Sequence, residues 1–282
     1  MNVSFIGITG FVGSGISRYL IDSGFKVIGI YRKDFNDSLL LKKKIEESDV
    51  IINVSGASIA GIWTKKKKKK IYCSRVNITR KVVEIINESD KKILFINASA
   101  VGIYDNINMH TEESKSYEKS FLTDVITDWE KEVYKLRSRN ARWIILRMGI
   151  VIDKGGGYLG KIGFLLKRKI CIIMGKRDEY LPIISLGELY NIIQFIINTE
   201  EIKGIVNAVS VFQVKIVDFY RALKETEGLK FCIKIPDICL KVLLGEASMI
   251  FLKGQQVIPD KLLKKGFNFR DTDIYKLLRN LR

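Results

Sequence analysis

The stretch Phe5-Ile6-Gly7-Ile8-Thr9-Gly10-Phe11-Val12-Gly13 places three glycines at a G-x-x-G-x-x-G spacing. It follows the apolar run Val3–Ile6 and precedes a helical pattern over Ser14–Ser23. In such a turn the first glycine permits a tight bend, the second lets backbone approach a pyrophosphate, and the third lets helix pack on strand. Free N–H groups and the helix dipole favour anions there. The stretch predicts a dinucleotide site, with a ligand-free turn as the alternative; its predicted contacts are Gly7, Thr9, Gly10, Phe11, Val12 and Gly13.

Apolar runs alternate with charged stretches of helical period through the first half of the chain. The charged stretches are Leu39–Ser48, Thr64–Asn87 and Leu122–Ser138, and the apolar runs are Val3–Ile6, Val27–Tyr31, Val50–Val54, Ile93–Asn97 and Trp143–Arg147. Continuous apolar strands between amphipathic helices predict βαβ units. We therefore expect an α/β fold with a doubly wound parallel sheet in residues 1–155.

The second half of the chain is expected to form a smaller C-terminal α+β lobe. We place this lobe in residues 156–282, with the substrate in the cleft between it and the sheet. Its predicted strands are Ile205–Ala208 and Phe231–Ile235, and its predicted helices lie around Lys241–Leu252 and Asp260–Lys265. A chain of 282 residues with 47% hydrophobic residues can bury a full core over both parts.

The residues after the second strand bear on the choice of dinucleotide. Ligands of such sheets bind beyond the carboxyl ends of the strands, where an acidic residue commonly binds the ribose 2′-OH of NAD. This chain has Tyr31 and Arg32 there, and a guanidinium suits a 2′-phosphate. We therefore predict that Tyr31 and Arg32 contact NADP(H) rather than NAD(H). Asp34 lies close by in the sequence, and Arg32 as one more surface cation is the alternative.

The ends of the next strands supply the remaining predicted contacts. Ser55, Gly56 and Ala57 are small residues that would let a cofactor lie across the sheet edge. Ser99 is a candidate hydroxyl donor to a substrate oxygen and to the cofactor, with capping of the strand end as the alternative. Arg147 is also predicted to contact the cofactor, because it ends the fifth strand.

The chain carries a net charge of +17, and six of its lysines form the run Lys65–Lys70. A lysine-biased composition explains this charge, and an anionic partner such as nucleic acid or a membrane surface is the alternative. The run has no interleaved aromatic residues and the chain has no nucleic-acid-binding motif, so we expect no specific nucleic acid partner. The six lysines are expected to form a solvated helix surface.

The cysteine and histidine residues do not form the patterns that are typical of zinc sites or disulfide frameworks. Cys73, Cys171, Cys232 and Cys239 form no C-x-x-C motif, and His110 is the single histidine. We therefore expect neither a zinc site nor a disulfide framework. Scattered thiols suit a reducing, cytoplasmic location. Because the chain begins at once with a strand and has no run of about 20 apolar residues, we expect no signal peptide and no membrane span.

A collinear series of motifs extends through the chain. The motifs are Asn53–Ala60, Trp63-Thr64, Ser74-Arg75-Val76, Ser99–Tyr104, Thr111-Glu112-Glu113, Asp128-Trp129-Glu130, Arg147-x-Gly149, Leu243-Leu244-Gly245-Glu246, Gly254-Gln255-Gln256-Val257-Ile258-Pro259 and Gly266-Phe267-x-Phe269. The series resembles the extended short-chain dehydrogenase/reductase (SDR) superfamily, and within it the atypical branch labelled "epimerase family protein" or cell division inhibitor. Residues 233–282 resemble that branch's small C-terminal domain of unknown function.

The resemblance implies an NAD(P)-binding Rossmann fold, a homodimer and an NADP(H)-dependent oxidoreductase or epimerase-like enzyme with an unknown small-molecule substrate. One departure concerns the shape of the domain. The usual fold has a further strand and helix between Arg32 and Val50, whereas this segment is long enough for one helix only.

A second departure concerns the catalytic pair. The tyrosine of the superfamily's Tyr-x-x-x-Lys pair would fall near Phe121 or Leu122. The lysine would fall near Val125 or Ile126. None of these apolar side chains can transfer a proton. The Tyr-x-x-x-Lys at Tyr220–Lys224 lies far along the chain, and we treat it as coincidence.

Two residues are left as acid or base candidates. Tyr104 is the best remaining tyrosine near the predicted crevice. His110 carries an imidazole, a side chain that commonly serves as an acid or base, although a solvated loop histidine is the alternative. The missing pair leaves a second function open, that of a catalytically silent dinucleotide-binding regulatory protein.

Overall fold

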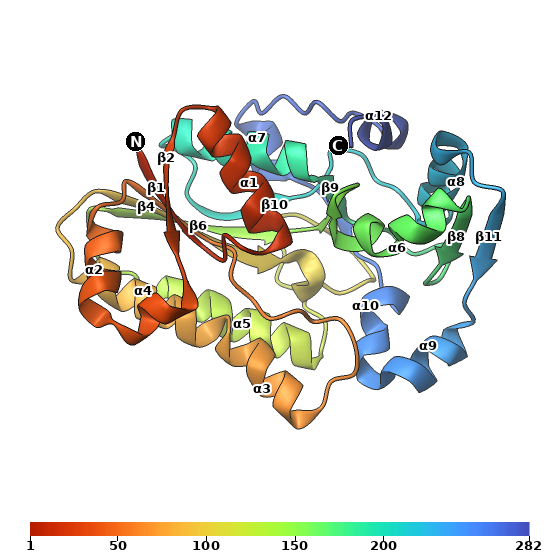
Figure 1. Ribbon diagram of the computed structural model, residues 1–282, viewed down its shortest axis with the longest axis horizontal. Helices are drawn as coiled ribbons and strands as arrows, with labels where there is room; N and C mark the ends of the chain where they lie inside the picture. Colours follow the sequence, from red (N-terminus) through yellow and green to blue (C-terminus); the bar gives the residue numbers. More distant parts are fainter. Residues whose placement is uncertain (282) are drawn as a thin grey trace.

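A six-stranded parallel sheet runs through the protein in the order β2–β1–β3–β4–β6–β10 (Figure 1). The computed structural model describes residues 1–281, apart from the side chains of Tyr158 and Lys161. The order reverses at β1, since the chain first adds β2 on one side and then β3 on the other. The strands are β1 Asn2–Ile6, β2 Lys26–Ile30, β3 Val50–Asn53, β4 Ile93–Ala100, β6 Ala141–Met148 and β10 Gly204–Ala208.

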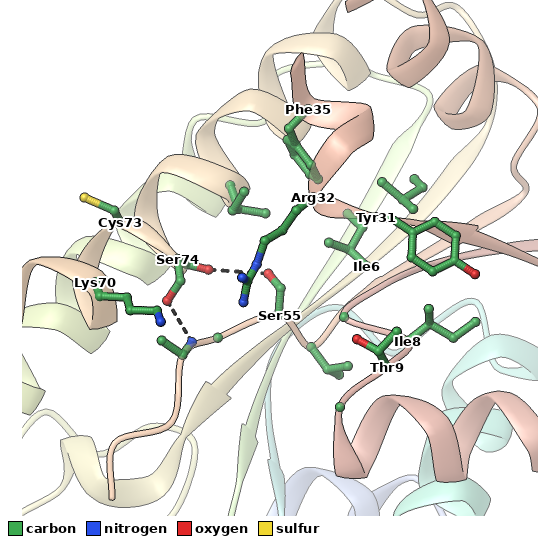
Figure 2. A pocket seen from close by; sticks show the side chains of 17 residues that line it. Ile6, Ile8, Thr9, Tyr31, Arg32, Phe35, Ser55, Lys70, Cys73 and Ser74 are labelled. Atoms are coloured by element: carbon green, nitrogen blue, oxygen red, sulfur yellow. Dashed lines mark hydrogen bonds between the residues drawn. The ribbon is translucent and has the colours of Figure 1, made fainter. Parts of the chain in front are cut away.

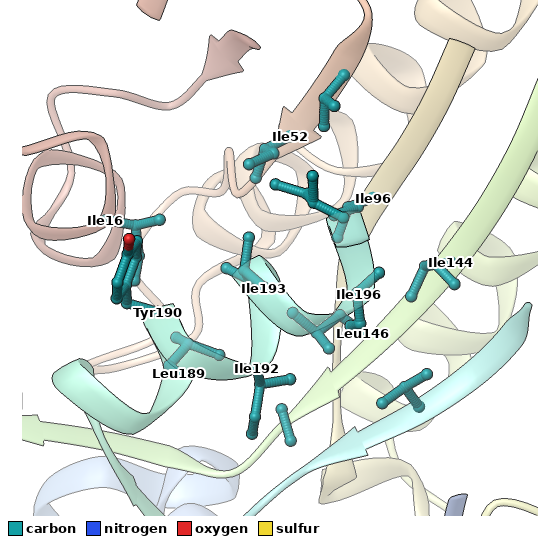
Figure 3. Close-up of a cluster of buried hydrophobic side chains, with 14 of the residues drawn as sticks. Ile16, Ile52, Ile96, Ile144, Leu146, Leu189, Tyr190, Ile192, Ile193 and Ile196 are labelled. Carbon is teal, nitrogen blue, oxygen red and sulfur yellow. The ribbon is translucent and has the colours of Figure 1, made fainter. Parts of the chain in front are cut away.

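Helices cover both faces of the sheet. On one face, α1 (Phe11–Asp22) and α7 (Leu186–Asn198) pack on strand side chains such as Phe5 and Ile96. Figure 3 shows Ile192, Ile193 and Ile196 of α7 against Ile52, Ile96 and Ile144 of the strands. On the other face lie α2 (Ser38–Glu46), α4 (Val76–Asn87) and α5 (Phe121–Tyr134). The strands are therefore buried on both sides, which explains their continuous apolar runs.

The smaller lobe packs around its own hydrophobic core, on the right of Figure 1. Side chains of α6, α8 and α12 surround the buried Cys171 of β8. The remaining elements are β5 Met109–His110, β7 Ile150–Asp153, β8 Ile170–Ile173, β9 Ile183–Ser185, β11 Phe231–Lys234, β12 Gln256–Val257, α3 Lys65–Cys73, α6 Gly157–Lys167, α8 Ile216–Glu227, α9 Asp237–Leu244, α10 Met249–Leu252, α11 Asp260–Lys264, α12 Ile274–Arg279, and the 3-10 turns η1 Arg32–Asn36, η2 Val101–Ile103 and η3 Gly245–Ser248.

The predicted α/β class and parallel sheet are confirmed, with two differences in the elements. The strand predicted at Ile205–Ala208 belongs to the central sheet as β10, beside β6, rather than to the lobe. β10 joins the central sheet because α7 precedes it. The apolar face of α7 is buried on the sheet, so the chain returns to the edge of the sheet after this helix. The helix predicted over Thr64–Asn87 is two helices, α3 and α4, which meet at Ser74 and Arg75.

Between β2 and β3 the chain forms only η1 and α2, as the length of that segment predicts. Across residues 1–281, no helix combines the length and the apolarity that crossing a bilayer requires.

We predict that Ile193→Ala lowers the free energy of unfolding by about 2–5 kcal/mol, because it removes a fully buried side chain between α7 and the sheet. Urea denaturation followed by circular dichroism measures this. The matched control is Ile238→Ala, which removes the same atoms from a side chain that is 65% exposed and should change stability by less than about 0.5 kcal/mol. Equal losses in the two variants would contradict the packing of α7 on the sheet.

Candidate functional site

A pocket of about 490 Å³ lies where the strand order reverses, beyond the carboxyl ends of β1, β2 and β3 (Figure 2). Ligands of doubly wound sheets bind at this switch point. Eight of the predicted cofactor contacts line the pocket, namely Gly7, Thr9, Gly10, Tyr31, Arg32, Ser55, Gly56 and Ala57. The lining also includes nine residues that are not predicted to contact the cofactor, namely Ile6, Ile8, Ile30, Phe35, Val54, Lys70, Cys73, Ser74 and Ile78.

The glycine turn can close only because its glycines lack side chains. Gly7 has a φ of +87°, and a Cβ there would lie 2.9 Å from the Cα of Ser55. A Cβ on Gly13 would lie 2.1 Å from the carbonyl oxygen of Gly7. The backbone of β1, the start of α1 and the end of β3 therefore lie in direct contact, which brings α1 to the edge of the pocket.

The start of α1 has amide groups that can bind an anion. Phe11, Val12 and Gly13 form the first turn, so their N–H groups have no acceptor within the helix. Gly10 precedes them and has no side chain to cap them. These three predicted contacts are absent from the pocket lining, but they directly follow the lining residue Gly10 in the chain. Three amides and a helix dipole suit a pyrophosphate.

Arg32 and Asp34 differ in their relation to the pocket. Asp34 is 1% exposed, and its carboxylate accepts hydrogen bonds from Lys44 Nζ at 2.6 Å and from the Tyr31 amide at 2.9 Å. Burial alone would raise the pKa of Asp34, but the bonds from Lys44 and Tyr31 outweigh it and the pKa is lowered. Arg32 extends into the pocket toward Ser55 and Ser74 (Figure 2). Its guanidinium has no hydrogen bond or ion pair with the described residues.

The segment after β3 is held against the junction of α3 and α4. The side chain of Asn53 accepts hydrogen bonds from the Ser55 amide at 3.1 Å and the Ser55 hydroxyl at 2.7 Å. The Ala57 amide donates to Ser74 Oγ at 2.8 Å, and Arg75 donates to the Ala57 carbonyl at 3.1 Å. Burial lowers the pKa of Arg75 to about 10. The helix break at Ser74 and Arg75 therefore positions one wall of the pocket.

The other predicted functional side chains form a polar network inside the protein. Arg147 is 1% exposed and forms a bidentate ion pair with Glu130, at 2.8 Å from Nε and 2.7 Å from Nη2. Ser99 donates a hydrogen bond to the same carboxylate. Burial alone would lower the pKa of Arg147, but Glu130 outweighs it and the pKa is raised. Ser99 and Arg147 are paired in register on β4 and β6, so both side chains face α5.

Tyr104 and His110 continue this network. The Tyr104 hydroxyl accepts a hydrogen bond from Arg147 at 2.8 Å and donates to Asn207 at 3.0 Å, and burial raises its pKa. The His110 ring stacks on Tyr104 at 4.7 Å and its Nε2 bonds Asp105 Oδ1 at 3.1 Å.

The four predicted residues in this network have exposed fractions of 2% or less and are absent from the lining of the pocket; they are Ser99, Tyr104, His110 and Arg147. The predicted position of Ser99 differs because β4 extends to Ala100, three residues beyond the predicted strand end, which keeps Ser99 inside the sheet. A catalytic role for Ser99, Tyr104 and His110 stays a prediction. At the superfamily's tyrosine and lysine positions, the side chains of Leu122 and Val125 pack in an apolar cluster with Trp63.

Two segments of the chain match known sequence families. Residues 3–124 match the NAD dependent epimerase/dehydratase family, and residues 235–281 match a domain of unknown function, DUF1731. The chain is 27% identical to the epimerase family protein YfhF of Bacillus subtilis, covering 100% of this chain and 98% of that protein. It is also 27% identical to the chloroplastic epimerase family protein SDR39U1 homolog of Arabidopsis thaliana, covering 99% and 86%. The chain is therefore similar over its whole length to proteins named epimerase family proteins, and its C-terminal residues match DUF1731.

Solved structures confirm the Rossmann-like fold. The human epimerase family protein SDR39U1, determined with NADPH, is 21% identical and superposes with a TM-score of 0.88 over 100% of this chain and 99% of that one. The UDP-glucuronic acid 4-epimerase of Bacillus cereus, determined with UDP-glucuronic acid and NAD, is 16% identical with a TM-score of 0.76 over 99% and 97%.

We predict that Glu130→Leu lowers the free energy of unfolding by about 3–5 kcal/mol, because it leaves the buried Arg147 guanidinium without a counterion. Urea denaturation measures the loss, and the double variant Arg147→Met/Glu130→Leu should recover most of it. Lys131→Ala, which breaks an exposed ion pair with Asp128 on the same helix, is the control. If Glu130→Leu cost no more than this control, the pair would not stabilise the strand ends.

We predict that Asp105 contributes to stability at neutral pH but not in acid. Burial alone would raise its pKa, but hydrogen bonds from Ser116, from the amides of Ile107 and Asn108 and from His110 outweigh it, and the pKa is lowered. The stabilisation is present above the pKa of the unfolded chain, about 3.9, and is lost as the pH falls toward the lower folded value.

Asp105→Asn should lower stability at pH 7 and flatten the decline in acid, as measured by thermal melting between pH 7 and pH 2. Asp124→Asn, at an exposed position on α5, is the control for a carboxylate outside this network. An unchanged pH dependence in Asp105→Asn would contradict the assigned role.

Proposed function

We propose that this protein binds NADP(H) in the pocket at the β1–β3 switch point, as an oxidoreductase or epimerase-like enzyme of the SDR superfamily. The observation that carries the proposal is the contrast between Arg32 and Asp34. The Arg32 guanidinium enters the pocket without a partner among the described residues, whereas the carboxylate of Asp34 is buried against Lys44. A free guanidinium binds a 2′-phosphate, and a carboxylate committed elsewhere is not available to a ribose 2′-OH.

The rest of the pocket fits the other parts of a dinucleotide. The first-turn amides of α1 suit the pyrophosphate, and Gly7 and Gly10 leave space for the backbone to approach it. Phe35, which lies near Arg32 in Figure 2, and Ile78 add apolar surface to the pocket lining, which suits the flat face of a purine.

The similar solved structures hold dinucleotides, and these differ in whether they carry a 2′-phosphate. Human SDR39U1 was determined with NADPH and the Bacillus cereus epimerase with NAD. Their shared fold does not choose between the two forms, so the choice for this chain rests on its own residues around the ribose.

A bound nicotinamide dinucleotide would supply hydride exchange with a carbinol carbon of the substrate. The chain's own residues bind and orient it, and the described pocket lining includes none of the three predicted catalytic residues. Ser99, Tyr104 and His110 are buried in the network around Arg147 and Glu130. This burial favours a second candidate function, namely a regulatory protein that binds the dinucleotide without turnover.

We predict that the wild-type protein binds NADPH more tightly than NADH, by at least about tenfold, because a charged hydrogen bond to the 2′-phosphate contributes about 1.5–3 kcal/mol. Arg32→Ala should lose most of that preference with little change for NADH. Isothermal titration calorimetry measures both affinities. The control is Lys33→Ala, which removes a neighbouring exposed cation that does not line the pocket.

Equal affinities for NADPH and NADH in the wild type would contradict the assignment of NADP(H). Absence of binding by either form would overturn the dinucleotide site itself. Absorbance at 340 nm then distinguishes the two candidate functions. Oxidation of bound NADPH by a carbonyl compound, such as a 4-keto nucleotide sugar, would establish an enzyme, whereas a stable complex with every substrate offered would favour the regulatory function.

A further inference from the structure

We infer that Lys70 is a second cation for the ribose phosphate, placed opposite Arg32 and specific to the phosphorylated form of the dinucleotide. The inference rests on the proposed NADP(H) site and deepens it, because it assigns a function to one member of the lysine run. Lys70 lines the pocket, and its ammonium group points into it from α3 while Arg32 enters from η1 (Figure 2).

The packing of α3 determines which lysine faces the pocket. Thr64 caps the helix through a hydrogen bond from the Lys67 amide, and Ile71 is fully buried beside Trp63 and Val125. Residues three and four positions apart share a helix face, so Lys70 lies on the same face as Cys73 and Ser74. Those three residues are the part of α3 and its C-cap that lines the pocket.

The other members of the run have different surroundings. Lys68 pairs with Glu246 of η3, and its ammonium lies 4.8 Å from the centre of the Phe121 ring, so it connects α3 to the C-terminal domain. Lys65, Lys66 and Lys69 are exposed and do not line the pocket. The Lys70 ammonium group has no hydrogen bond or ion pair with the described residues, so its charge is available to a ligand.

The charge balance of the pocket explains why a second cation matters. Its described lining contains Arg32 and Lys70 but no aspartate or glutamate. A phosphate monoester carries a charge of about −1.5 to −2 at pH 7, so two cations can neutralise it. A ribose 2′-OH is neutral and would leave both cations unpaired. Arg32 and Lys70 together therefore raise the affinity for the phosphorylated nucleotide through electrostatic attraction. A single arginine would raise this affinity less.

The test uses adenosine 2′,5′-bisphosphate as the probe and adenosine 5′-monophosphate as the probe without the 2′-phosphate. Calorimetry compares the wild type, Lys70→Ala, Arg32→Ala, the double variant and Lys69→Ala. Lys70→Ala should weaken binding of the bisphosphate about tenfold and leave the monophosphate unchanged. Lys69→Ala should change neither, because it removes the same charge from an exposed position on the same helix.

Three further readouts sharpen the test. The double variant should lose less than the product of the single losses, since both cations bind one phosphate. The affinity of Lys70→Ala for the bisphosphate should depend less on salt concentration than that of the wild type. Lys70→Glu should weaken the bisphosphate further than Lys70→Ala. Circular dichroism checks that α3 is intact in each variant.

The outcomes separate this inference from the function on which it rests. If the wild type prefers NADPH through Arg32 but Lys70→Ala behaves like Lys69→Ala, the assignment of Lys70 is overturned and the proposed function stands. If Lys69→Ala weakens the bisphosphate as much as Lys70→Ala, the effect comes from the general charge of α3 and the assignment is also overturned. If the wild type binds neither dinucleotide, the proposed function fails and Lys70 has no such role.

Discussion

Backbone contact at the glycine turn is the constraint on which the rest of the site depends. A side chain at Gly13 would overlap the carbonyl of Gly7, and one at Gly7 would press on the backbone of Ser55. These contacts place the end of β1, the start of α1 and the end of β3 together. The same closeness leaves the first-turn amides of α1 free at the pocket edge. The pocket is therefore a consequence of how tightly three backbone segments can pack.

The sheet could be predicted largely from sequence because its strands are buried on both faces. Val3–Ile6 is apolar except for Ser4, Val50–Val54 is apolar except for Asn53, and helical patterns separate such runs. The place of β10 in the central sheet could not be predicted from the sequence, because a short apolar run does not show which sheet the strand joins. Its place depends on α7, whose packing on the sheet is a contact between distant parts of the chain.

Some residues of the site could be placed from the sequence and others could not. Arg32 and the segment from Ser55 to Ala57 follow strands directly, so their place at the pocket could be predicted from the strand ends. Ser99 could not, because periodicity does not determine whether a strand stops at Asn97 or continues to Ala100. The orientation of Lys70 could not be predicted either, because a run of six identical residues gives no pattern that singles out one of them.

The two regions beyond the strand ends differ in a way that bears on function. Around β1 to β3, the pocket presents the unpaired cations Arg32 and Lys70 and is open to a ligand. Around β4 and β6, Glu130 and Arg147 bind each other and also bind the side chains of Ser99 and Tyr104. Groups that are already paired with one another stabilise the fold and are less available to bind a substrate. The residues proposed for dinucleotide binding and those predicted for proton transfer therefore form separate sets, and the first function can be present without the second.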